Sequence, residues 1–147
     1  MISFFVYGTL RTPAGGPKDD TGNYPQIEPH VSSSIPAVLR GAKMCSLIHY
    51  PGIRPGTGSV IGEILEMSEE GLRIADEIEG HPDWYVRERV TVETADGAER
   101  DVWTYWAPED LFESGLPIES GNWFSRDRSA DDGRTQEQAI AEDRENL

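Results

Sequence analysis

The run Phe5-Val-Tyr-Gly-Thr-Leu-Arg11 is the most informative stretch of the chain, because it joins an apolar strand to a glycine turn. Residues 2–7 are almost all β-branched or aromatic, which is typical of a buried strand. Gly8 ends that strand and permits a close backbone approach, so successive N–H groups can cradle a carboxylate or an oxyanion. A simple tight turn after an edge strand would use the same residues.

A capped helix is expected at Ser68-Glu-Glu-Gly-Leu-Arg-Ile-Ala-Asp-Glu-Ile-Glu-Gly80. Ser68 can accept a hydrogen bond from the first turn, and the two glutamates that follow suit the positive end of the helix dipole. Gly80 stands where a left-handed residue would end the helix. The segment is therefore predicted to be one amphipathic helix with defined ends.

Glu79 has an unusual place on this helix. At about 100° per residue it falls between Leu72 and Ala75 in the apolar stripe, whereas the other charged residues gather on a solvated face. Burial and the negative end of the helix dipole both disfavour a carboxylate, so the pKa of Glu79 should be raised toward neutrality, where acid–base catalysis operates. Fraying of the last turn, which would rotate the side chain into solvent, is the alternative.

The rest of the chain is predicted to be rich in strands. Residues 11–34 have no sustained periodicity and are expected to form a long loop, a candidate lid, and residues 51–58 are rich in turn formers. The residues beyond Arg126 are charged and poor in apolar side chains, so residues 129–147 are expected to be a disordered or loosely helical tail after a domain of residues 1–128. The expected strands are residues 37–39, 42–50 and 59–67, with a hairpin of residues 84–94 and 101–106.

Composition excludes several classes of partner. Thirteen Lys and Arg stand against 27 Asp and Glu in 147 residues, a formal charge of -14, so nucleic acid and anionic membrane surfaces are not expected to bind. No apolar run approaches the ~20 residues of a membrane-spanning helix, and the first residues lack the marks of a signal peptide. A cytoplasmic location is expected.

Cysteine and histidine give no sign of redox or metal chemistry. Cys45 is the only cysteine, which excludes an internal disulfide, and its apolar surroundings favour a buried, inert thiol over a nucleophile. His30, His49 and His81 are scattered along the chain, so no metal site and no cofactor are expected.

Taken in order, several segments resemble the gamma-glutamylcyclotransferase-like superfamily, which includes gamma-glutamylamine cyclotransferase and small bacterial relatives. The similarity extends from about residue 2 to about residue 128, with compatible spacing. The segments are Phe5-Val-Tyr-Gly-Thr-Leu-Arg11, Tyr50-Pro-Gly52, Gly58-Ser-Val-Ile-Gly-Glu63, Asp76-Glu-Ile-Glu-Gly80 with Tyr85-Val-Arg87, and Ile118-Glu-Ser-Gly-Asn-Trp123.

The resemblance implies a small mixed α/β (α+β) domain built around a partly closed β-barrel with flanking helices. It implies an enzyme that releases 5-oxoproline and an amine or amino acid from a small gamma-glutamyl compound, with Glu79 as the general base and then the general acid. No cofactor and no enzymatic nucleophile would be needed, because the substrate's own α-amine attacks its γ-carbonyl. The oligomeric state and the identity of the leaving amine are left open.

The resemblance also assigns the substrate site. The turn residues Tyr7, Gly8, Thr9 and Leu10 correspond to the family's substrate-binding loop. Tyr85 would be a pocket residue through its phenol, or a strand aromatic that only packs. Arg87 would pair with a substrate carboxylate, or be a surface residue that alternates with Arg89.

One rival function remains on the same fold. Residues 11–34 are longer and richer in Gly and Pro than the short, often helical stretch of family members, and this stretch adjoins the expected pocket. A non-catalytic module that binds a small molecule or a protein would keep the pocket without the chemistry. An enzyme requires Glu79 to be buried, unpaired by Arg or Lys, and directed at residues 7–10.

Overall fold

A computed structural model describes residues 1–13, 18–47 and 49–126. Along the chain, the helices and strands of this part are β1 (Ile2–Val6), η2 (Lys18–Thr21), α1 (Tyr24–Ile27), η3 (Glu28–His30), β2 (Val31–Ser46), β3 (Pro51–Met67), α2 (Glu69–Glu79), β4 (Val86–Thr94), β5 (Glu99–Trp106), α3 (Glu109–Glu113), β6 (Leu116–Ile118) and η4 (Trp123–Ser125).

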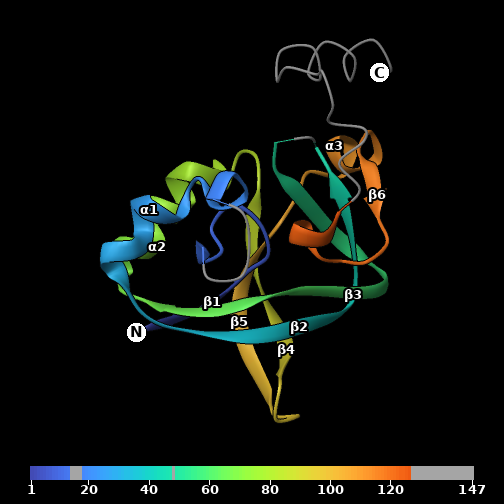
Figure 1. Cartoon of the computed structure of the whole chain (residues 1–147). Coiled ribbons are helices and arrows are strands. Elements are labelled where there is room, and N and C mark those ends of the chain that lie inside the picture. Colours follow the sequence, from blue (N-terminus) through green and yellow to red (C-terminus); the bar gives the residue numbers. More distant parts are fainter. Residues whose placement is uncertain (14–17, 48, 127–147) are drawn as a thin grey trace.

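The strands form a closed five-strand barrel with helices outside it, as the predicted fold class requires (Figure 1). The order is β3-β1-β5-β4-β2-β6, and β2 also pairs with β3, so the first five strands close on themselves. Only β1 and β5 run parallel; the other neighbours are antiparallel. α1 and α2 lie on one side of the barrel, and α3 and β6 lie on another.

Strand β1 supplies both layers of the core because its side chains alternate. Phe5 packs into a cluster drawn mainly from β1 to β5, with Ile118 of β6 and Trp123 of η4, which fills the barrel. Phe4 and Val6 pack into a second cluster with Ala75 of α2 and Ile27 of α1, outside the barrel. This two-sided burial explains why residues 2–6 read as a continuous apolar run.

The predicted capped helix is confirmed. The Ser68 hydroxyl accepts a hydrogen bond of 3.2 Å from the Gly71 N–H, and Gly80 has a left-handed φ of 70°. The Gly80 N–H bonds to the carbonyls of Asp76 and Glu77, which ends α2 directly after Glu79. The predicted hairpin is confirmed as β4 and β5, although its first strand begins at Val86 rather than at residue 84.

The middle strands differ from the prediction. Residues 37–39 and 42–50 were expected as two strands and residues 51–58 as turns, yet β2 and β3 are each continuous over these positions. Gly41, with a φ of 78°, sits at an irregularity where the register jumps from Arg40 opposite Ser59 to Ala42 opposite Pro55. Local turn formers are accommodated there as a bulge, since the partner strand still supplies the ladder.

The long-loop prediction for residues 11–34 is wrong over its described part. Residues 18–30 form η2, α1 and η3, and β2 begins at Val31. Tyr24 and Ile27 are buried in the outer core cluster, so a segment rich in Gly and Pro still contributes two core side chains. Helices of three or four residues are too short to leave a periodic signal.

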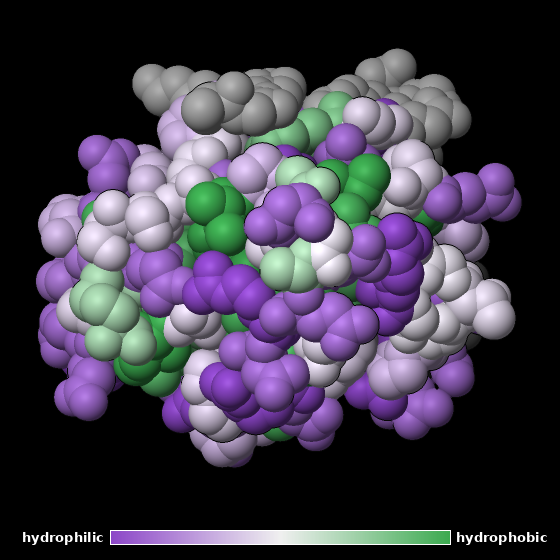
Figure 2. All heavy atoms as spheres, turned by 90° about the horizontal axis from the view of Figure 1, so that it is seen from below, coloured by the Kyte–Doolittle hydropathy of each residue, from purple (hydrophilic) through white to green (hydrophobic). Residues whose placement is uncertain are grey.

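Other expectations concern burial and the chain's end. Cys45 is buried, as predicted. Within the described residues, no helix combines the length and apolar character needed to cross a membrane. Seen from below, most of the surface is hydrophilic, with hydrophobic atoms in separate patches (Figure 2). The predicted tail at residues 129–147 lies outside the described residues, so the domain boundary stays a prediction.

Candidate functional site

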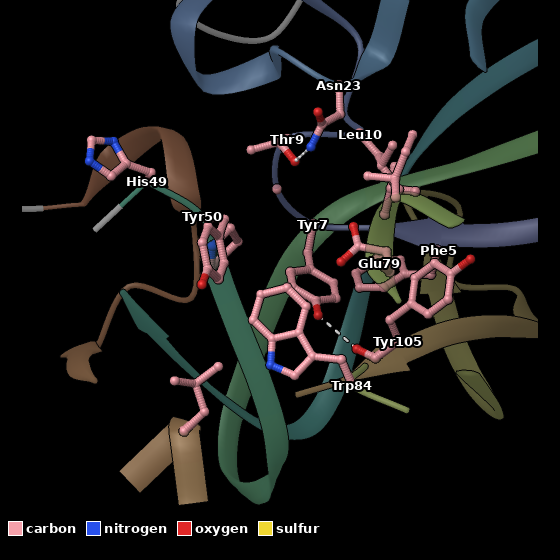
Figure 3. A pocket seen from close by; sticks show the side chains of 15 residues that line it. Phe5, Tyr7, Thr9, Leu10, Asn23, His49, Tyr50, Glu79, Trp84 and Tyr105 are labelled. Atoms are coloured by element: carbon pink, nitrogen blue, oxygen red, sulfur yellow. Dashed lines mark hydrogen bonds between the residues drawn. The ribbon is translucent and has the colours of Figure 1, made fainter. Parts of the chain in front are cut away.

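A cavity of about 490 Å³ lies where the end of α2 meets the turn after β1 (Figure 3). Glu79 and the four residues Tyr7, Gly8, Thr9 and Leu10 line it together, although about 70 positions separate them in the sequence. Most other wall residues are apolar or aromatic. The structure therefore brings the out-of-place acid and the glycine turn to one site, as the sequence predicts.

The Glu79 carboxyl is directed into this cavity. It is half-buried, and in the described part of the chain it has no hydrogen bond and no ion pair with Arg, Lys or His. Burial raises its pKa from 4.5 to about 7. The side chain can therefore exchange protons near neutral pH, and fraying of the last turn does not release it into solvent.

The turn after β1 offers unused donors to the cavity. The Arg11 N–H bonds to the Gly8 carbonyl at 2.9 Å, which closes a turn with Thr9 and Leu10 at its centre. Within the described residues, the N–H groups of Gly8, Thr9 and Leu10 have no acceptor. Three consecutive donors at a cavity wall can hold a carboxylate or an oxyanion.

Gly8 is required for a different reason from the one the sequence suggests. A Cβ at this position would lie 2.4 Å from Cγ of Pro51, the first residue of β3. Glycine thus lets the turn pack closely against Pro51. This contact holds the turn, and with it the ligand-facing side of the cavity, in a fixed position. Asn23 fixes the other side, where its N–H bonds to the Thr9 carbonyl at 3.0 Å and its amide bonds to the Thr9 hydroxyl at 2.7 Å.

The phenol of Tyr7 is occupied within the fold. It donates a hydrogen bond of 2.7 Å to the Tyr105 carbonyl on β5. Burial raises the pKa of Tyr7 well above its usual value, and the nearby charge of Glu79 raises it further. Tyr7 thus contributes a fixed ring to the cavity wall and a neutral neighbour to Glu79.

Arg11, which ends the motif of β1 and its turn, is an anchor of the fold. Its Nε donates to Glu63 of β3 at 2.7 Å, both side chains are less than a tenth exposed, and it also donates to the Asn122 side-chain oxygen at 3.1 Å. Glu63 accepts further hydrogen bonds from Thr12 and Ser34. Because this buried pair is satisfied, it fixes the chain just after the cavity turn.

Tyr85 and Arg87, which the resemblance assigns to substrate binding, do not line the cavity. Tyr85 is almost completely buried, and its phenol donates to the Pro51 carbonyl at 2.9 Å. The Arg87 Nε donates to both carboxylate oxygens of Asp76, at 3.0 and 3.1 Å, and its guanidinium lies over the Trp103 ring. Both polar groups are therefore already used by the protein.

Sequence reasoning missed several wall residues, which are Asn23, His49, Tyr50, Trp84 and Leu111. Tyr50 belongs to a quoted motif and Trp84 adjoins another, but the spacing of these motifs does not reveal which of their residues face a cavity. Leu111 lies on the short helix α3, and Asn23 lies in the segment that was read as a loop. For these two residues the sequence held no periodic signal.

Comparison with known proteins defines the class. The chain belongs to the "Gamma-glutamyl cyclotransferase, AIG2-like" family, whose model matches residues 4–125. It is 30% identical over 129 residues to a protein of Methanocaldococcus jannaschii named "Putative gamma-glutamylcyclotransferase", covering 84% of this chain and 96% of the relative. It is 32% identical over 128 residues to the "Gamma-glutamylcyclotransferase family protein YtfP" of Escherichia coli K12, covering 86% and 100%.

Solved structures agree with this assignment. An AIG2-like protein of Mus musculus superposes with a TM-score of 0.55 at 26% identity, over 82% of this chain and 87% of that one. The shared architecture extends over most of both chains.

Proposed function

We propose that this protein is a gamma-glutamyl cyclotransferase that converts a small gamma-glutamyl compound into 5-oxoproline and a free amine or amino acid. The observation that carries the proposal is the Glu79 carboxyl: it lies in a cavity, has no partner in the described residues, has a pKa of about 7 and shares the cavity with three unused N–H donors. Family membership supports the reaction class.

The first step moves a proton to Glu79. As a carboxylate, Glu79 accepts a proton from the substrate's α-ammonium, which leaves a neutral amine. The amine nitrogen then forms a bond to the γ-carbonyl carbon of the same molecule, and the carbonyl oxygen gains negative charge. The N–H groups of Gly8, Thr9 and Leu10 belong to residues that line the cavity and have no acceptor in the described residues, which supports a role in stabilising this oxygen.

The second step returns the proton. When the tetrahedral intermediate collapses, the bond between the γ-carbon and the leaving nitrogen breaks, and protonated Glu79 donates to that nitrogen. The ring nitrogen, which still carries two hydrogens after its attack, then gives up the second proton, through the same carboxylate, to the released amine, which leaves as an ammonium ion. The product is a five-membered lactam, and the reaction consumes no water and needs neither an enzymatic nucleophile nor a cofactor. A pKa near 7 suits a group that must first accept and then donate.

In this mechanism the main contribution of the enzyme is to orient the substrate. Intramolecular attack requires a bent substrate, and a largely apolar cavity that holds the ends of the substrate can supply much of the rate acceleration through orientation. The rigid ring of Tyr7 and the turn held by Pro51 and Asn23 are suited to this task. A metabolite-binding module would use the same cavity but would not need an unpaired carboxyl with a raised pKa.

The test is a screen of the purified protein against a panel of gamma-glutamyl amino acids and gamma-glutamyl amines, with 5-oxoproline as the measured product. Release of 5-oxoproline from at least one class at catalytic turnover is expected. Tight binding of panel members without 5-oxoproline release would instead favour the binding module. The cytoplasmic location and the absence of nucleic-acid and membrane partners stay predictions.

A further inference from the structure

The cavity has an aromatic wall whose open face belongs to Trp84. The Trp84 and Tyr50 rings lie 5.7 Å apart at 74°, and the Trp84 and Tyr85 rings lie 5.1 Å apart at 78°. Trp84 lines the cavity and is still 41% exposed, so the neighbouring tyrosines do not cover it completely. In Figure 3 the Glu79 carboxyl points toward the side of the cavity on which Tyr50 lies.

The charges around this wall favour a cation over an anion. In the described part of the chain, the cavity is lined by no Arg and no Lys, and its ionisable residues apart from the tyrosines are Glu79 and His49. Asp83 precedes Trp84 and is exposed, and α3, which contributes Leu111 to the wall, also carries exposed acids. The whole chain carries a formal net charge of -14, which has the same sign. A carboxylate on this side of the cavity would therefore be repelled.

A second hollow shares Trp84 with the aromatic wall. It has a volume of about 230 Å³, and Trp84 lines both it and the main cavity. Val86 and Trp106 give it apolar sides, and the exposed carboxylate of Glu88 lies on it. Arg54 also lines it and donates to the Ala107 carbonyl at 3.3 Å. The second hollow therefore lies beside Trp84 with apolar sides and one charge of each sign.

From these features, and resting on the proposed function, we propose that the leaving group is an amine whose far end carries a positive charge. The aliphatic part of this amine lies against Trp84 and Tyr50, and its terminal ammonium is held by their ring faces and by the surrounding acids. An amino-acid leaving group, which ends in a carboxylate, would find no Arg and no Lys among the described residues that line the main cavity.

Three gamma-glutamyl amides of matched length test this preference, made from 1,5-diaminopentane, hexylamine and 6-aminohexanoic acid. They differ only in a terminal ammonium, methyl or carboxylate group. All three compounds are assayed at the same pH and ionic strength. The expected kcat/KM for the ammonium compound is about tenfold above that for the methyl compound, with the carboxylate compound lowest. Equal values, or a preference for the carboxylate, would overturn the proposal.

Substitutions at Trp84 separate a cation–aromatic contact from simple apolar packing. Trp84→Phe keeps a ring and should preserve the order of the three compounds. Trp84→Leu keeps apolar volume and should reduce the advantage of the ammonium compound over the methyl compound to about twofold or less. An undiminished tenfold advantage in Trp84→Leu would show that Trp84 does not select the charge.

Binding separates failure of this proposal from failure of the proposed function. If neither the three amides nor any member of the gamma-glutamyl panel releases 5-oxoproline, the cyclotransferase proposal fails, and calorimetry of the same amides with the unmodified protein then measures the subsite directly. If the panel is turned over but the ammonium amide is not, the cation subsite is rejected while the cyclotransferase proposal stands. Tighter binding of the ammonium compound, lost in Trp84→Leu, would support a cation subsite in a protein of another function. Binding that does not depend on the terminal group would reject the subsite as well.

Discussion

The Tyr105 phenol donates a hydrogen bond of 2.7 Å to the Asp76 carboxylate, one helical turn before Glu79. The Arg87 side chain donates to the same carboxylate, and the Arg87 backbone N–H donates to His81 Nδ1 at 3.1 Å. Strands β4 and β5 thus hold the last turn of α2 through one aspartate. Since the Tyr105 carbonyl also accepts from Tyr7, the same tyrosine connects Asp76 with the cavity wall.

Asp76→Asn should therefore shift Glu79 from its position, although Asp76 itself does not contact the substrate. We expect kcat to fall about tenfold while KM changes less than about twofold, because a small misplacement of a proton-transfer group affects the chemical step. The variant should also lose about 1–3 kcal/mol of unfolding free energy through the weakened ion pair. Asp101→Asn, an exposed aspartate on β5, is the control. An unchanged kcat in a destabilised Asp76→Asn protein would limit Asp76 to a structural role.

The raised pKa of Glu79 sets the pH dependence of activity. The carboxylate is the form that accepts the proton, so kcat/KM should rise about tenfold per pH unit below about 7 and level off above it. Rates measured between about pH 5 and 8 on one gamma-glutamyl substrate locate the break. A break close to 4.5, the ordinary value for a glutamate, would mean that the acting group is not a desolvated Glu79.

The same pKa shift makes the fold less stable as pH rises. Between pH 4.5 and about 7 the native state still holds a proton that the unfolded chain has released, so unfolding free energy falls across this window. Glu79→Gln removes the titration, and its stability advantage over the unmodified protein should grow by up to about 3 kcal/mol over the window and then stay constant. Urea unfolding at several pH values measures the difference. An advantage that does not change with pH would contradict burial of the charge.

Ile27 tests the corrected reading of the segment after the cavity turn. Ile27→Ala should cost about 2–5 kcal/mol, as expected for a fully buried side chain in a packed cluster. Gln26→Ala, at the exposed neighbouring position, should change stability by less than about 0.5 kcal/mol. Urea unfolding of both variants decides the matter. A loss below about 1 kcal/mol for Ile27→Ala would restore the interpretation of this segment as a loose lid.

The sequence predicted well those features that depend on local chemistry with a clear period. The serine and glycine ends of α2, the hairpin and the apolar run of β1 each follow from such patterns. The place of Glu79 followed as well, because a helix keeps its angular order up to its cap. These elements bring the acid and the turn together.

Features that depend on distant partners could not be derived from spacing. β2 and β3 are continuous because they pair with each other, and Gly41 and Pro55 are accommodated at a bulge in this pairing. The polar groups of Tyr85 and Arg87 are engaged by Pro51 and Asp76, residues that only the folded structure brings near. A motif can therefore locate a site while leaving open which of its residues face the ligand.

The most direct test of the account compares 5-oxoproline release by the unmodified protein, Glu79→Gln and Glu77→Gln on the best substrate of the panel. Glu77 is exposed on the same helix and paired with Arg73, so its replacement should leave turnover within about twofold. Glu79→Gln should lower turnover by roughly a hundredfold or more with the fold intact, because the positioned acid–base group is lost. Near-normal 5-oxoproline release by folded Glu79→Gln would contradict the central claim.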